Sequence, residues 1–271
     1  MPLILQEFIE SGEKMQYNIA GDCMIGLQNP FISVDYYGRP SFGGDQRCCS
    51  GKVLQRCGCG VVAALDMLLY LNRWHSDVHI PEFANLCASS PLPQPAYEQA
   101  LEKLRQAYFP LFYPFGMNGL TLSLGINLFF KRHALPFKAR WSVPEAQLWQ
   151  RIGTMLERDL PVIMAVGPNF PRFWQKKGTN FCRLLPEGRY VPSVSVRAHF
   201  ITATGLDAEW VELSSWGSKY YMSRAEFVRY TRECSNSLLC SILYIEHNIL
   251  HNAFNAIIYD TKYLIMCIII S

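Results

Sequence analysis

Residues 57–71 read Cys57-Gly58-Cys59-Gly60-Val61-Val62-Ala63-Ala64-Leu65-Asp66-Met67-Leu68-Leu69-Tyr70-Leu71, a run that is apolar on nearly every side. A helix on the surface would carry polar residues along one face, so this pattern predicts a buried central helix that begins near Cys59. A thiol in the first turn lies near the positive end of the helix dipole and near free backbone N–H groups. Both favour the thiolate, and we therefore expect the pKa of Cys59 to be lowered.

A histidine far along the chain is the expected partner of this thiol. His199 opens the β-like run Ala198-His199-Phe200-Ile201-Thr202-Ala203-Thr204. A cysteine at a helix start and a histidine at a distant strand start are typical of a thiol–imidazole nucleophilic site. The alternatives are a small buried core cysteine and a strand histidine bonded to backbone. Cys57 competes for the nucleophile role, but it precedes the expected helix start.

The composition describes a compact globular chain. Of its 271 residues, 50% are hydrophobic and 17% are charged, which excludes a disordered protein. The net charge of +3 is spread over short clusters such as Lys131-Arg132 and Lys176-Lys177. The absence of a basic stripe with interleaved aromatic residues argues against nucleic acid as a partner.

The N-terminal sequence indicates a cytoplasmic protein. Met1-Pro2-Leu3-Ile4-Leu5-Gln6-Glu7-Phe8 has neither the basic start nor the apolar core of a signal peptide. Disulfides are therefore not expected among the ten cysteines, which become core fillers, metal ligands or nucleophiles. Residues 263–270 form an apolar run that is too short for a membrane span.

A zinc site is the alternative use of the cysteines. Cys48, Cys49, Cys57 and Cys59 are clustered, but an adjacent pair followed by Cys-x-Cys does not match the usual spacing of zinc ligands. His75 and His79 are four residues apart, but their surroundings indicate a helix end and a loop. We expect neither a metal nor another cofactor.

The order of patterns predicts an α+β fold with helices first and an antiparallel sheet second. We expect a lead-in over residues 1–42, one domain over residues 43–246 and a hydrophobic tail over residues 247–271. Residues 41–58 are expected to form a loop that leads into the Cys59 helix. Further helices are expected to open at Pro81 and Pro95 and to cover residues 120–133 and 145–158; strands are expected at 137–141, 160–167, 199–204, 210–214, 219–222 and 238–246.

Three blocks, in order, resemble papain-like cysteine peptidases, most closely the bacterial branch that includes the leader-cleaving peptidase domains of bacteriocin exporters. They are Gly58-Cys59-Gly60-Val61-Val62-Ala63-Ala64, Ala198-His199-Phe200-Ile201-Thr202-Ala203-Thr204-Gly205-Leu206-Asp207 and Leu213-Ser214-Ser215-Trp216-Gly217. The resemblance covers roughly residues 43–235. The separation of Cys59 from His199 falls within the about 130–150 residues of papain-type pairs.

The resemblance implies a cysteine peptidase in which the Cys59 helix packs on an antiparallel sheet that bears His199. Cys59 would form an acyl-thioester with a peptide or protein substrate, and His199 would act as the general base. An amidase or acyltransferase with the same thiol chemistry is one alternative. A catalytically inactive binding module is the other.

Two positions depart from the family. The family orients its histidine with Asn or Asp, and the matching residue here is Ser214, whose hydroxyl stabilises an imidazolium less well. Glu212, on the same strand, is the alternative. The family also places an oxyanion-hole Gln about six residues before the cysteine. We expect Gln46 to fill this role, with the intervening loop as an insertion, and Gln55 remains the alternative.

Overall fold

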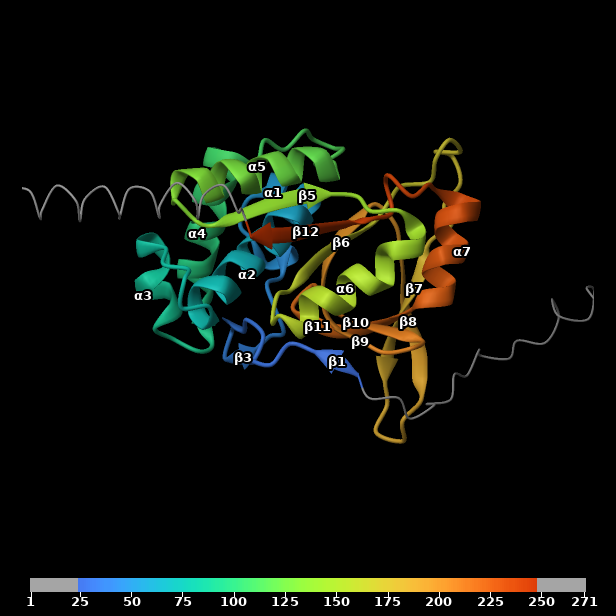
Figure 1. Cartoon of the computed structure of the whole chain (residues 1–271), viewed down its shortest axis with the longest axis horizontal. Helices are drawn as coiled ribbons and strands as arrows, with labels where there is room; N and C mark the ends of the chain where they lie inside the picture. The colour runs from blue at the N-terminus through green and yellow to red at the C-terminus, as the bar shows by residue number, and fades with distance from the viewer. Residues whose placement is uncertain (1–23, 248–271) are drawn as a thin grey trace, which may run out of the picture.

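The structure is a computed structural model that describes residues 24–247. Helices α1 to α5 gather in one half of the molecule, and most strands form an antiparallel sheet in the other half together with α6 and α7 (Figure 1). The expected α+β class is therefore confirmed.

The helices differ from the expected ones in two places. They are α1 (Lys52–Cys57), α2 (Cys59–Trp74), α3 (Ala84–Cys87), α4 (Gln94–Tyr108), α5 (Gly119–Arg132), α6 (Leu148–Glu157) and α7 (Arg224–Cys234), with 3₁₀ turns at Gln46–Cys48, Pro81–Phe83 and Glu145–Gln147. The expected loop over residues 41–58 contains α1 and one of these turns. The sequence analysis missed α7, although Ser223 and Glu226 have the spacing of a capping box, and the Ser223 side chain does cap this helix.

The larger sheet has the order β5-β12-β6-β9-β10-β11-β7-β8, with β1 paired to β9. Its strands are β1 (Ile25–Gly26), β5 (Phe137–Trp141), β6 (Val162–Val166), β7 (Thr179–Leu184), β8 (Tyr190–Val196), β9 (His199–Leu206), β10 (Trp210–Ser215), β11 (Ser218–Ser223) and β12 (Ile242–His247). All of these pairings are antiparallel. The β7–β8 hairpin was not expected, whereas the other strands of this sheet from β5 onward were.

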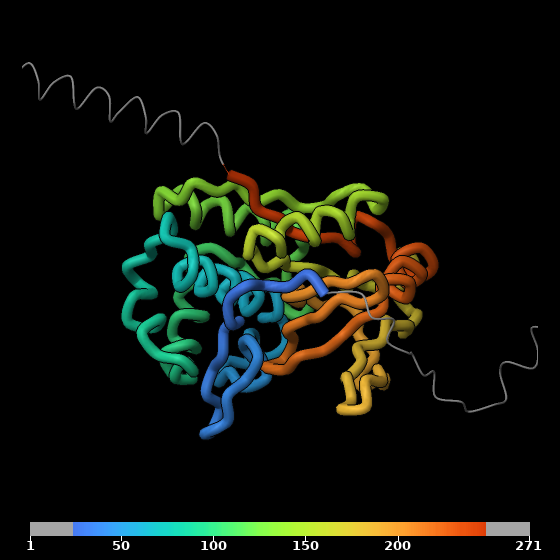
Figure 2. The backbone as a smooth tube through the Cα atoms, turned by 60° about the horizontal axis from the view of Figure 1, so that its bottom comes forward, coloured from blue at the N-terminus to red at the C-terminus, as the bar shows by residue number. Residues whose placement is uncertain are grey.

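The N-terminal part of the described chain is integrated into this body. A small sheet of β3 (Arg39–Pro40), β2 (Val34–Tyr36) and β4 (Leu92–Pro93) lies beside the helices. Figure 2 shows the N-terminal described residues, in blue, running next to the strands of the large sheet, where β1 pairs with β9. Residues 1–23 of the expected lead-in and residues 248–271 of the expected tail lie outside the described residues. Within residues 24–247, no helix is long and apolar enough to cross a membrane.

Helix α2 is the centre of the core, as its apolar pattern predicts. Every residue from Gly60 to Leu71 is buried, and the helix contacts β6, β9, α3, α4 and α5. A Cβ on Gly60 would lie 3.1 Å from the Phe200 ring, so glycine permits the close approach of α2 to β9. This approach brings the start of α2, where Cys59 lies, to the start of β9, where His199 lies.

We predict that Leu68→Ala will lower the free energy of unfolding by about 2–5 kcal/mol, because it opens a cavity beside a side chain that has no solvent exposure. Chemical denaturation measures this change. Leu124→Ala on α5 is the matched control, because Leu124 is 70% exposed, and its effect should stay within about 0.5 kcal/mol. Equal losses for the two variants would contradict a core centred on α2.

Candidate active site

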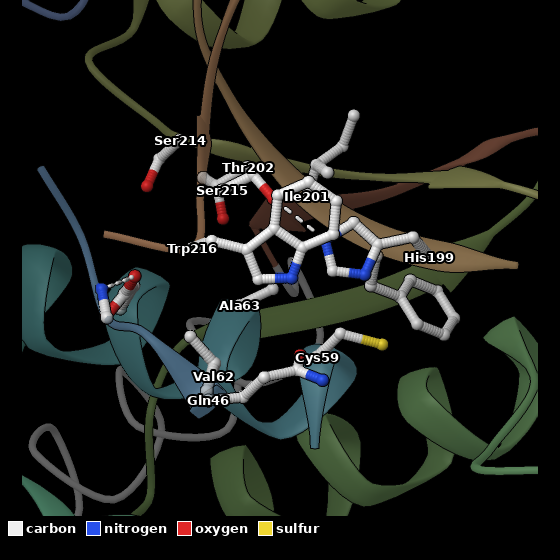
Figure 3. Close-up of a pocket in the computed structure, with 13 residues that line it drawn as sticks. Gln46, Cys59, Val62, Ala63, His199, Ile201, Thr202, Ser214, Ser215 and Trp216 are labelled. Atoms are coloured by element: carbon white, nitrogen blue, oxygen red, sulfur yellow. Dashed lines mark hydrogen bonds between the residues drawn. The ribbon is translucent and has the colours of Figure 1, made fainter. Parts of the chain in front are cut away.

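Cys59 is the first residue of α2, directly after Gly58, and its side chain is partly exposed. It lines a small hollow together with Gln46, Asp66, His199, Ser215 and Trp216 (Figure 3). These residues come from the first half of the central helix, from the loop before it, and from β9, β10 and the turn that follows β10. The structure thus brings together the two residues on which the sequence-based hypothesis depends.

His199 is held at the head of β9 with one ring nitrogen engaged. The strand pairs His199 with Val166 of β6, and the imidazole is buried. Its Nε2 lies 2.8 Å from the Ser215 hydroxyl oxygen. In Figure 3 the other ring nitrogen lies on the side of the imidazole that faces Cys59. The backbone N–H of Phe200, the next residue, forms a polar contact with the Cys59 thiol.

The residue that bonds His199 is Ser215, which corrects the expectation for Ser214. Ser214 lies opposite Thr202 in the β9–β10 pairing, and side chains alternate between the two faces of a strand. Ser214 therefore shares a face with Thr202, while Ser215 lies on the face of His199. The Ser214 hydroxyl instead donates to the Phe42 carbonyl at 2.8 Å. Ser214 thus lines the hollow but does not bond to the histidine.

Glu212 does not reach His199 either. Its carboxylate accepts hydrogen bonds from Thr204 and Tyr221 and forms an ion pair with Lys219 at 2.8 Å. A register shift between Glu212 and Leu213 separates this residue from the part of β10 that borders the hollow. The sequence-based alternative for the orienting residue is therefore also corrected.

Trp216 covers the imidazole. Its ring stacks on that of His199 with centroids 4.3 Å apart and an interplanar angle of 16°. Trp216 and Gly217 both have positive φ and join the paired residues Ser215 and Ser218, as in a type I′ turn. The Arg47 guanidinium donates to the Trp216 carbonyl at 3.0 Å. The tight turn therefore places the Trp216 ring against one face of the His199 imidazole.

Gln46 lies in the hollow, as the sequence analysis preferred, and Gln55 does not. The Gln46 side chain is buried and donates to the Gln55 carbonyl at 2.9 Å, which leaves its second N–H available. Gln55 is exposed, and its own amide binds the Cys49 carbonyl. Helix α1 occupies part of the sequence between Gln46 and Cys59, where an inserted loop over residues 48–54 was expected.

Burial shifts the pKa values of both reactive groups toward their neutral forms. Desolvation raises the pKa of Cys59, and the N–H groups of Phe200 and Gly60 offset only part of this increase. Desolvation, followed by the charge of Arg47, lowers the pKa of His199 to about 3. The expected depression of the Cys59 pKa is therefore wrong. Both shifts favour a thiol and a neutral imidazole over an ion pair at neutral pH.

A larger cavity of about 660 Å³ is also lined by Cys59 and His199. Its lining is mainly apolar, and exposed aromatic side chains, among them Phe112, Phe115 and Phe173, lie at its border. Residues of segment 112–121 and of segment 165–168 both contribute to this lining. The cavity offers a bound molecule access to the thiol and the imidazole together.

The cysteines of the zinc alternative do not converge. Among residues 24–247, no three His, Cys, Asp or Glu side chains are placed to hold a metal ion. The Cys57 thiol instead donates to the Pro114 carbonyl at 3.5 Å.

Comparison of the chain with family models, curated proteins and solved structures finds no match.

We predict that alkylation of Cys59 by iodoacetamide will speed up about tenfold per pH unit from pH 6 to 8, because its raised pKa keeps the thiol protonated over this range. Mass spectrometry of the Cys59 peptide measures the rate. His199→Gln should change this rate less than about threefold, since a neutral imidazole does not stabilise the thiolate. A pH-independent rate at mildly acidic pH, lost in His199→Gln, would instead reveal a resting ion pair.

Proposed function

We propose that this protein is a thiol hydrolase that cleaves a peptide bond through an acyl-thioester on Cys59, with His199 as the general base. The observation that carries this proposal is that Cys59 and His199 border the same hollow and the same substrate-sized cavity. A nucleophile, a base and a group that orients the base are the minimal set for such catalysis. Cys59, His199 and Ser215 supply this set.

The neutral resting pair defines how the first step proceeds. With Nε2 protonated and donating to Ser215, Nδ1 of His199 carries the lone pair and takes the thiol proton as the sulfur attacks the substrate carbonyl. The protonated imidazole then gives this proton to the leaving amine, and the acyl group stays on Cys59. Water, deprotonated by His199, releases the acyl group as a carboxylic acid and restores the thiol.

The oxyanion that forms in these steps needs hydrogen-bond donors. The second N–H of the Gln46 side chain and the backbone N–H of Cys59, in the first turn of α2, are the candidate donors at this hollow. Gln46 is buried and held by the Gln55 carbonyl, so its amide is in place before substrate binds. Such preorganised donors are typically worth about 10²–10³ in rate.

The cavity favours a substrate with bulky apolar groups beside the scissile bond. Its aromatic border and its apolar floor would bury such groups, at about 25 cal/mol for each Å² removed from water. Arg56, beside Cys57 in the lining, donates to Tyr113 and is the cation on this border. The same apolar cavity would also accept the acyl group of an amidase or acyltransferase substrate.

A catalytically inactive binding module is the second candidate. The raised pKa of Cys59 and the lowered pKa of His199 both reduce the reactivity of the resting site. A hydroxyl at Ser215 also stabilises an imidazolium less than a carboxylate would. A module of this kind would retain the cavity and bind peptides without cleaving them.

The test combines a peptide library rich in Phe, Leu and Trp with an acyl-directed electrophile that labels nucleophilic cysteines. We expect wild-type protein to release new peptide termini and Cys59→Ser to lose about 10³-fold or more of this turnover, because the hydroxyl is a far weaker nucleophile at this site. Mass spectrometry identifies the products. Peptide binding without products in both proteins would favour the binding module, and transfer to added amines in place of hydrolysis would favour the acyltransferase.

Ser215→Ala should lower kcat by about tenfold, because the imidazole then loses the bond at Nε2 that sets its orientation. Ser214→Ala is the matched control, since its hydroxyl bonds to Phe42 and not to His199. Its kcat should stay within about threefold of wild type. A larger loss for Ser214→Ala than for Ser215→Ala would contradict this assignment of the orienting residue.

A further inference from the structure

Asp66 is a buried carboxyl that the proposed reaction does not use. It lies on α2 two turns beyond Cys59, is 2% exposed and borders the same hollow. A carboxyl inside an apolar helix is costly unless both of its oxygens are bonded. Its Oδ2 accepts the Gly44 backbone N–H at 2.8 Å, and its Oδ1 accepts the Tyr97 hydroxyl at 2.7 Å.

The Gly44 bond attaches the Cys59 helix to the loop that carries Gln46. The loop has little freedom at this point. A Cβ on Gly44 would meet the Tyr97 hydroxyl at 2.0 Å, and one on Gly43 would meet the Ser214 hydroxyl at 2.1 Å. The backbone therefore approaches Asp66 as closely as only glycine allows.

The same loop residue also bonds to the turn that covers His199. The Gly217 N–H donates to the Gly44 carbonyl at 3.0 Å, and the Phe42 N–H donates to the Gly217 carbonyl at 3.0 Å. Trp216, which stacks on the imidazole, directly precedes Gly217. A continuous set of hydrogen bonds thus runs from Asp66 through Gly44 to the Trp216 turn.

Burial and two hydrogen bonds determine the pKa of Asp66. Desolvation raises the pKa of Asp66 to about 7, and the bonds from Gly44 and Tyr97 lower it only in part. Tyr97 of α4 and Tyr36 of β2 have pKa values raised by burial and stay neutral at this pH. The remaining charges on the adjoining loop, Asp45 and Arg47, form an ion pair with each other at 2.7 Å.

We infer that Asp66 is a positioning residue for catalysis: through the Gly44 N–H it holds Gln46 and the Trp216 turn in place around Cys59 and His199. Ionisation strengthens the bond to Gly44, because a carboxylate accepts more strongly than a carboxyl group. The loop is therefore held more firmly above neutral pH than below it. This inference rests on the proposed function only where turnover is the readout.

Two substitutions separate positioning from burial. Asp66→Asn keeps an oxygen for the Gly44 N–H, and its amide can donate to the Tyr97 oxygen. Asp66→Leu has a similar size but accepts neither bond. We expect Asp66→Leu to lower kcat about 10–100-fold and Asp66→Asn less than about fivefold, while iodoacetamide labels Cys59 at the same rate in both, because alkylation needs no oxyanion donor. Loss of labelling and turnover together in a folded Asp66→Leu protein would overturn the inference.

A second measurement does not depend on activity or on the folding of Asp66→Leu. Hydrogen exchange at the Gly44 amide, followed by NMR and corrected for intrinsic exchange, should show a protection factor that rises about threefold or more between pH 6 and 8 in wild type. In Asp66→Asn this factor should stay constant, since the amide does not ionise. Equal pH dependence in the two proteins would refute the role of Asp66. Absence of turnover in wild type, with this difference present, would refute the peptidase and leave intact the inference that Asp66 anchors the Gly44 loop.

Discussion

The burial of α2 from Gly60 to Leu71 is the constraint on which the other features depend. A stretch of helix without an exposed face must be covered on all sides, and β6, β9 and the neighbouring helices provide this cover. Its polar side chains must find partners inside the protein. Asp66 finds Gly44 and Tyr97, and Tyr70 bonds to Asp159. Each partner lies on a different segment, so covering one helix fixes the positions of several loops.

The same burial sets the chemistry of the hollow. A helix N-terminus is worth about 0.3–1 kcal/mol to a nearby negative charge at exposed sites, and the Cys59 sulfur gains some of this from nearby N–H groups. Desolvation of the thiolate costs more, so the pKa of Cys59 rises. For His199 burial and the Arg47 charge act in the same direction and favour the neutral ring. In the proposed reaction, proton transfer therefore accompanies the attack on the substrate.

The β10–β11 turn and the end of β10 supply the contacts of the His199 ring with Trp216 and Ser215. Trp216 adopts a left-handed backbone conformation with φ of 48°, which costs about 1–3 kcal/mol for a residue other than glycine. Two interactions of Trp216 offset this cost: its ring stacks on His199, and its carbonyl accepts a hydrogen bond from Arg47. The turn also ends β10 just after Ser215, whose hydroxyl bonds to Nε2. Strain of this kind concentrates at functional sites.

The sequence by itself determined the central helix and the strand that carry the two candidate residues, Cys59 and His199. The apolar run after Gly60 fixed a buried helix that starts at Cys59, and the β-like run fixed a strand that starts at His199, because both patterns report local burial. Only the tertiary structure decided between Ser214 and Ser215, since a strand's face depends on its pairing register with β9. It also decided the direction of both pKa shifts. The desolvation of a group depends on all the segments that pack around it, and these segments are distant in the chain. A local sequence pattern therefore does not predict it.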